Sequence, residues 1–136
     1  MKVGIVGSRK FTNWVVIKES ILSLKEEYGD NLEIVSGGQA KGANGIAKSC
    51  AIEFKIKYIE FPPAHYMHNE YCIRGRENYG KSYSVSNYFD RNTEIAEYSD
   101  MILCFIPQGM RITESRGTFD TYTKALRLGK KVLVIN

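Results

Sequence analysis

Five short apolar runs, separated by polar segments, constrain the fold of this chain more than any other feature. The runs are KVGIV (2–6), LEIVS (32–36), IKYIEF (56–61), MILCFI (101–106) and KVLVI (131–135). Continuous rather than alternating hydrophobicity is typical of strands that helices cover on both faces. The sequence therefore predicts an α/β fold, built on a doubly wound, Rossmann-like parallel sheet of five main strands.

Helical periodicity fills most gaps between these runs. A first helix is expected to begin at the capping residue Thr12 or Asn13 and to end at Gly29. A second follows the glycine-rich loop, and two more are expected near 89–98 and at 118–128. Because crossovers between parallel strands are right-handed, this connectivity predicts the strand order 3-2-1-4-5 in a single domain covering residues 1–136.

Three polar loops should meet at one edge of this sheet. In a doubly wound sheet, ligands bind where the strand order reverses, outside the carboxyl ends of the strands. The loops that the topology places there are GSRKF (7–11), SGGQAKGANG (36–45) and PQGMRITESRGT (107–118). We therefore expect one cleft between them.

The glycine loop at 36–45 excludes two common nucleotide motifs. Gly37 and Gly42 have the spacing of a phosphate-binding P-loop, but Ala43 and Asn44 stand where that motif needs Lys and a hydroxyl. The first strand also lacks the GxGxxG fingerprint of dinucleotide-binding domains. Neither an NTPase nor an NAD-dependent dehydrogenase is indicated.

Two helix starts in these loops can bind an anion. Free N–H groups at a helix start attract phosphate, and glycine lets a ligand approach the backbone. Such starts are expected at Gly42 and at Gly117-Thr118. Each glycine loop alone could be only a tight turn, but two at one sheet edge, together with Arg9, favour an anion site.

Five ordered motifs resemble the SLOG superfamily of Rossmann-like domains, especially its small stand-alone bacterial and phage members. The motifs are GSRKFTN, SGGQAKGANGIA, PPAHY, RNTEIAEYSD and SRGTFDTYTKA. The superfamily includes LOG-type nucleoside monophosphate phosphoribohydrolases, DNA-processing protein A and domains that sense NAD-derived nucleotide signals. The resemblance implies a pocket for a nucleotide or its derivative, without choosing among these activities.

The resemblance also implies roles for individual residues. The pocket floor would hold Gly7, Ser8 and Arg9, and one wall would hold Ser36, Gly37, Gly38, Gly42 and Asn44. Arg91 and Asn92 match the family's RN pair, and an arginine there could bind phosphate through two parallel hydrogen bonds. The phosphate cradle would be Ser115, Gly117 and Thr118.

Departures from the family pattern argue against the hypothesis that this chain is a LOG-like hydrolase. LOG enzymes carry a glutamate in PGGxGTxxE, and Thr121 occupies that position here. Asn44 stands where close relatives have Asp, so a further possible acid or base is missing. Glu114 and Asp120 remain as weak catalytic candidates near the cleft.

The segment at about 64–88 has no regular periodicity and holds five of the nine tyrosines. Long irregular segments in small domains are commonly functional. We expect either a lid over the cleft or a contact with another subunit, with Tyr79 and Tyr83 as the residues to test. Its HxxHxxxC pattern is a weak metal signal because no fourth ligand is evident. We therefore expect no metal site and no resident cofactor.

Composition bounds the remaining possibilities. Three unpaired, widely spaced cysteines favour a reducing cytoplasm, and no apolar run approaches membrane-spanning length. The net charge of +4 is compatible with a phosphate-bearing partner. The chain is expected to be a homo-oligomer that senses or sequesters a nucleotide-derived signal of the cyclic or ADP-ribose type. A LOG-like phosphoribohydrolase is the first alternative, and a nucleic-acid-binding protein is the second.

Overall fold

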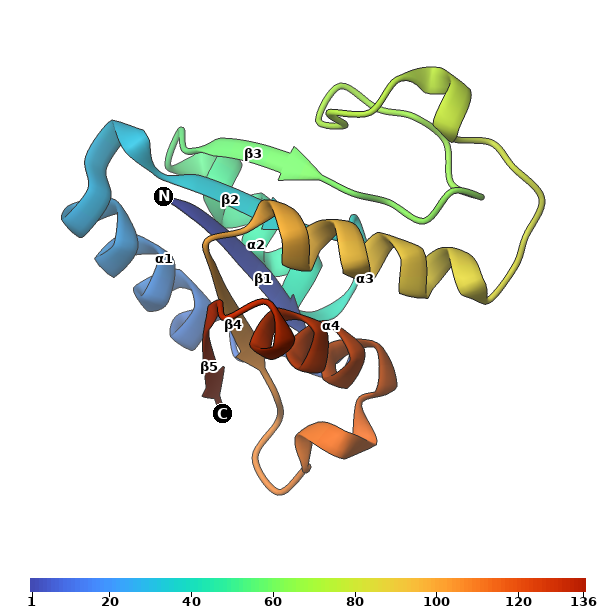
Figure 1. The fold of residues 1–136 in the computed structure, drawn as a ribbon. Coiled ribbons are helices and arrows are strands. Elements are labelled where there is room, and N and C mark those ends of the chain that lie inside the picture. Colours follow the sequence, from blue (N-terminus) through green and yellow to red (C-terminus); the bar gives the residue numbers. More distant parts are fainter.

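The computed structural model describes all residues, 1–136, and contains one parallel five-stranded sheet. The strand order β3-β2-β1-β4-β5 confirms the predicted topology. Figure 1 shows β1 in the centre, with the chain winding outward on one side before it crosses to β4. The strands are β1 (Lys2–Gly7), β2 (Glu33–Ser36), β3 (Lys57–Glu60), β4 (Met101–Phe105) and β5 (Lys131–Ile135).

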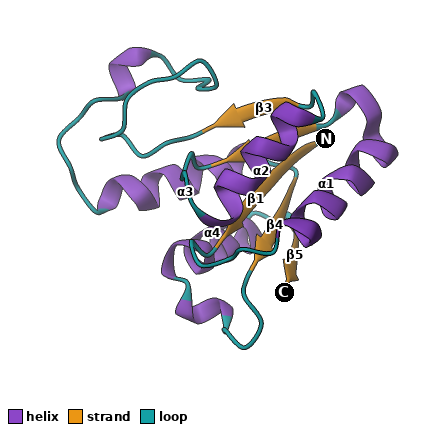
Figure 2. Ribbon diagram, turned by 180° about the vertical axis from the view of Figure 1, so that it is seen from behind, coloured by secondary structure: helices purple, strands orange, loops and turns teal.

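Four helices cover the two faces of the sheet (Figure 2). A core cluster of 18 buried residues lies between the sheet and the first two helices, and nine residues form the core under the other two. Burial on both faces explains why the strands are continuously apolar. The helices are α1 (Trp14–Tyr28), α2 (Gly42–Glu53), α3 (Ser86–Tyr98) and α4 (Arg116–Arg127).

Local sequence signals position most of these elements. The Asn13 side chain caps α1, because its Oδ1 accepts a hydrogen bond from the N–H of Val16 at 3.4 Å. Gly29 adopts a positive φ of 58° directly after the helix, which a residue without a Cβ tolerates. Three single 3₁₀ turns occur in connecting segments, at Gly29–Asn31, Arg76–Asn78 and Ile112–Glu114.

The irregular segment is shorter than expected, because α3 begins at Ser86 rather than near residue 89. The Ser84 side chain accepts a hydrogen bond from the N–H of Ser86 at 3.3 Å, and this local turn starts the helix early. The segment from β3 to α3 projects beyond the sheet in Figures 1 and 2. No helix of the protein is both long and apolar enough to cross a membrane.

Candidate functional site

A cavity of about 420 Å³ lies at the carboxyl end of β1, where the strand order reverses. Segments from four parts of the chain line it, and all three predicted loops contribute. The lining residues are Val6, Gly7, Ser8, Arg9, Lys10, Gly37, Gln39, Asn44, Val85, Tyr88, Phe89, Arg91, Asn92, Ile95, Met110, Glu114, Ser115, Arg116, Gly117, Thr118 and Thr121.

The first turn of α4 presents free hydrogen-bond donors to this cavity. Helix α4 begins at Arg116, two residues earlier than expected, and no side chain caps it. The backbone N–H groups of Arg116, Gly117 and Thr118 have no acceptor within the protein. The Ser115 hydroxyl instead donates to Thr118 Oγ1 at 2.9 Å. Open donors at the positive end of a helix dipole suit a phosphate or carboxylate.

Arg91 is a buried cation without a counter-ion. Its side chain lines the cavity, although only 7% of the residue is exposed, and it forms no ion pair with any carboxylate. Nη1 donates to the carbonyl oxygen of Gly37, and Nε donates to Asn92 Oδ1 at 3.0 Å. Burial, with a smaller effect of the nearby Arg9 charge, lowers the pKa of Arg91 to about 10. A bound anion would supply the missing counter-charge.

The two glycines of the SGG loop make room for the protein's own side chains. A Cβ on Gly37 would lie 2.8 Å from the guanidinium carbon of Arg91, and a Cβ on Gly38 would lie 3.2 Å from the carboxyl carbon of Glu60. Gly38 also has a positive φ of 78°. Gly38 is absent from the cavity lining, so its predicted place in the wall needs correction, whereas Gly37 does line the cavity. Gly37 admits the arginine that can contact a ligand.

Three of the predicted wall residues are absent from the cavity lining. Ser36 is fully buried, and its hydroxyl pairs with that of Tyr58 at 2.7 Å. Gly38 faces Glu60, and Gly42 packs beneath the backbone of Ser8. These residues therefore pack against other parts of the protein rather than line the cavity.

Asn92 connects the cavity to the first turn of α4. Its Nδ2 donates to the carbonyl oxygen of Gly117 at 3.3 Å and to Asp120 Oδ2 at 3.2 Å. The same Asp120 oxygen accepts from Lys124 Nζ at 2.8 Å. Asp120 is therefore engaged inside the protein and does not line the cavity.

Only one acidic residue lines the cavity. Glu114 is exposed, and its Oε1 accepts from Arg111 Nε at 3.2 Å. Thr121, at the position of the LOG glutamate, also lines the cavity and is only 1% exposed. Its hydroxyl donates to the carbonyl oxygen of Gly117. The cavity thus contains no buried carboxylate.

One wall of the cavity is apolar and was missed from the sequence. Val85, Tyr88 and Phe89 come from the start of α3, and Met110 comes from the loop after β4. The Tyr88 ring lies 5.7 Å from the guanidinium carbon of Arg91. The sequence predicts a start of this helix near residue 89, and these residues were therefore not assigned to the cavity. Lys10, Gln39 and Arg116 were also missed.

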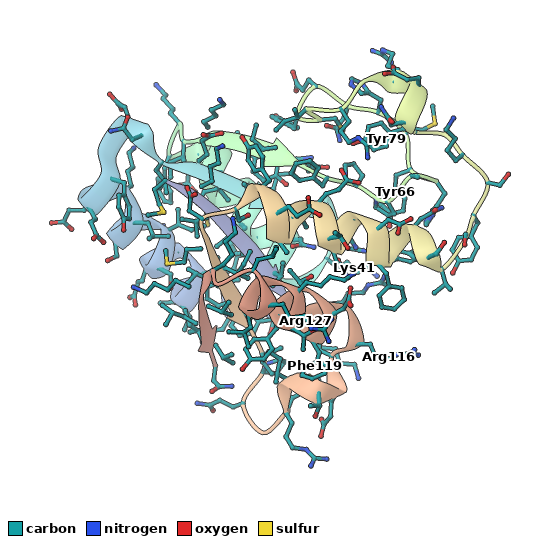
Figure 3. All side chains as sticks on the ribbon, viewed as in Figure 1. Lys41, Tyr66, Tyr79, Arg116, Phe119 and Arg127 are labelled. Carbon is teal, nitrogen blue, oxygen red and sulfur yellow. The ribbon has the colours of Figure 1, made fainter.

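The two tyrosines chosen as lid candidates lie outside the cavity lining. Tyr79 is 9% exposed and packs near His68, inside the projecting segment (Figure 3). Tyr83 is 70% exposed, and its ring contacts His65 with the centroids 4.8 Å apart. The projecting segment reaches the cavity through Val85 instead.

Asn44 contributes an unused acceptor to the cavity. Its Oδ1 is buried and has no hydrogen-bond partner in the protein. A buried polar atom of this kind is costly unless a partner is supplied. A hydroxyl or amino group on a ligand would satisfy it. No group of three or more His, Cys, Asp or Glu side chains is arranged to hold a metal ion.

Fold and cavity together define a doubly wound α/β protein with a cation-rich cleft at its switch point. Residues 1–68 match the model of the YAcAr family, described as the YspA, cpYpsA-related SLOG family. The chain belongs to this SLOG family. No curated protein matches its sequence.

The fold is similar to that of several solved structures, of which three are described. A molybdenum cofactor binding protein from Rippkaea orientalis has a TM-score of 0.68 at 19% identity, over 98% of this chain and 74% of that one. The molybdenum cofactor carrier protein of Chlamydomonas reinhardtii has a TM-score of 0.65 at 18% identity, over 98% and 74%. DNA processing protein A from Helicobacter pylori, which binds single-stranded DNA, has a TM-score of 0.67 at 21% identity. That match covers all of this chain and 65% of the other.

Proposed function

We propose that this protein binds a phosphate-bearing nucleotide, or a small molecule derived from one, in the cavity and holds it without cleaving it. Arg91 is the observation that carries the proposal. A guanidinium that is 7% exposed, lacks a counter-ion and lines a cavity is costly unless an anion binds there.

The cavity offers a separate place for each part of such a ligand. The phosphate would accept hydrogen bonds from the free N–H groups of α4 and from Arg91, with Arg9 nearby. A planar ring would lie against Tyr88 and Phe89 on the apolar wall. A hydroxyl or amino group could donate to Asn44 Oδ1. A volume of about 420 Å³ lies in the usual range for small-molecule sites.

The positions and hydrogen-bond partners of the acidic residues favour binding without cleavage. Hydrolysis of an N-glycosidic bond needs a carboxyl group poised at the reacting bond. Asp120 is tied to Asn92 and Lys124, and Glu114 is exposed and paired with Arg111. Because Glu114 does line the cavity, a phosphoribohydrolase remains the second candidate.

Structural neighbours are consistent with both small-molecule and nucleic-acid ligands. Two of them bind the molybdenum cofactor, and one binds single-stranded DNA. Three further cationic residues, Arg9, Lys10 and Arg116, also line the cavity and would favour any phosphate-bearing partner. Arg116 projects from the start of α4 in Figure 3.

Mass spectrometry separates these functions. The purified protein is incubated with nucleoside monophosphates, cyclic nucleotides, NAD-derived nucleotides and a single-stranded oligonucleotide. The solution and the heat-denatured protein are then analysed. Intact nucleotide released only on denaturation supports the proposal. Free base that accumulates in excess of protein overturns it in favour of a hydrolase, and retention of the oligonucleotide alone favours nucleic-acid binding.

A further inference from the structure

The two edge strands of the sheet, β3 and β5, differ in how far other segments of the chain cover them. At the β3 edge, the N–H of Glu60 donates to the carbonyl oxygen of Tyr71 at 3.0 Å, and Glu60 forms a parallel bridge with Cys72. The projecting segment therefore covers the carboxyl end of that edge. At the β5 edge the strand order ends with no further segment. Leu133 and Val134, on opposite faces of β5, are 44% and 46% exposed.

The free hydrogen-bonding groups of β5 can be identified from its pairing with β4. Ile106 donates its N–H to the carbonyl oxygen of Ile135 at 2.9 Å, so the backbone groups of Ile135 point toward β4. Groups alternate along a strand, and those of Leu133 therefore point the same way. The N–H and C=O groups of Val132 and Val134 point outward, to the open edge.

We propose that a second copy of this chain covers the edge, with the two β5 strands antiparallel and a twofold axis at Leu133. In this register Val132 of one copy exchanges two hydrogen bonds with Val134 of the other, and the symmetry repeats the pair. All four outward groups at each edge are then satisfied. A twofold axis at Val132 or Val134 would leave some of them unpaired.

Charge and hydrophobicity favour the same arrangement. Lys131 is the only charged residue of β5. The antiparallel register separates the two lysines by four residues, roughly 13 Å, whereas a parallel register would place them side by side. At the twofold axis, Leu133 faces its own symmetry mate as a non-hydrogen-bonded pair, where side chains approach closest. An exposed apolar edge strand is otherwise prone to uncontrolled pairing.

The dimer would be a continuous ten-stranded sheet with independent ligand cavities. No residue of β5 lines the cavity. Dimerisation can therefore fail while ligand binding persists, and the reverse also holds. This independence separates the present inference from the proposed function.

Analytical ultracentrifugation tests whether the open edge of β5 is a dimer interface. We expect the native protein to form dimers and Leu133→Lys, which places two like charges at the axis, to weaken dimerisation by at least about tenfold. Ile52→Lys on α2 is the matched control, because Ile52 is 50% exposed and lies on a different element. A native protein that is monomeric at all concentrations, or a dimer that Leu133→Lys leaves intact, overturns the proposal. Circular dichroism confirms that both variants are folded.

Disulfide trapping tests the register, in a Cys72→Ser background that removes the partly exposed native thiol. Leu133→Cys should crosslink to its symmetry mate on mild oxidation, since the Cα atoms of a non-hydrogen-bonded pair are about 4.5 Å apart. Val134→Cys should not, because its partner is Val132. Efficient crosslinking of Val134→Cys, without that of Leu133→Cys, would overturn the register.

Discussion

Replacement of Gly37 by alanine should abolish tight anion binding while leaving the fold intact. The new Cβ would lie 2.8 Å from the guanidinium carbon of Arg91, where ordinary contacts begin at 3.4 Å. The guanidinium must then move by more than half an ångström. It cannot do so without weakening its bonds to the carbonyl oxygen of Gly37 and to Asn92 Oδ1. The arginine is expected to leave its place over the cavity.

The effect on stability should be small because two contributions oppose each other. Loss of the two hydrogen bonds costs about 1 kcal/mol each. Burial lowers the pKa of Arg91 from 12.5 to about 10, which corresponds to roughly 3 kcal/mol against the charged form. Release of the side chain to water recovers part of that energy. We expect the free energy of unfolding to change by about 1 kcal/mol or less, measured by urea denaturation.

Affinity should change far more than stability. One charge-assisted hydrogen bond contributes about 1.5–3 kcal/mol, so the Kd for AMP should rise roughly 10- to 100-fold. Isothermal titration calorimetry measures this, with a double-mutant cycle to Arg91→Ala as the control. If Gly37→Ala acts only by displacing Arg91, it has no further effect in the Arg91→Ala background. Unchanged AMP affinity in Gly37→Ala would refute the assignment of Arg91 as the anion anchor.

Three further changes probe the remaining features. Tyr88→Ala should weaken AMP about tenfold and leave pyrophosphate binding unchanged, since aromatic stacking contributes about 1–3 kcal/mol; equal losses for both ligands in calorimetry would contradict a ring-binding wall. Glu60→Gln should lower the free energy of unfolding by about 1–3 kcal/mol, because it removes a buried charge that lies 3.0 Å from Lys48 Nζ. An unchanged urea midpoint would count against that role. Burial raises the pKa of Tyr98 to about 12, and it also raises that of Tyr58. Above pH 10 the unfolded chain releases phenolic protons that the native state retains, so stability should fall as pH rises. Absorbance titration at alkaline pH should show delayed ionisation of these tyrosines, and uniform ionisation near pH 10 would contradict it.

Several features of the site followed from local sequence signals, and others did not. Arg9, Gly117 and Thr118 could be selected because helix starts, glycines and charged loop residues are visible in short windows. Arg91 was selected only because it matches the RN pair of the family pattern. The apolar wall was missed because the start of α3 depends on the turn at Ser84, which no hydrophobic period reveals. Asp120 could not be separated from a catalytic acid, because its partner Asn92 lies 28 residues away.

The sequence by itself determined the strand order and the edge of the sheet where the cavity forms. Hydrophobic period and crossover handedness are sufficient for that, since both depend on the chain path rather than on side-chain contacts. Only the tertiary structure decided what the SGG loop does. Gly37 and Arg91 are 54 residues apart, and their contact arises only when α3 packs beside the end of β2. The same packing buries the arginine without an ion-pair partner, because no carboxylate lies within ion-pair distance of it.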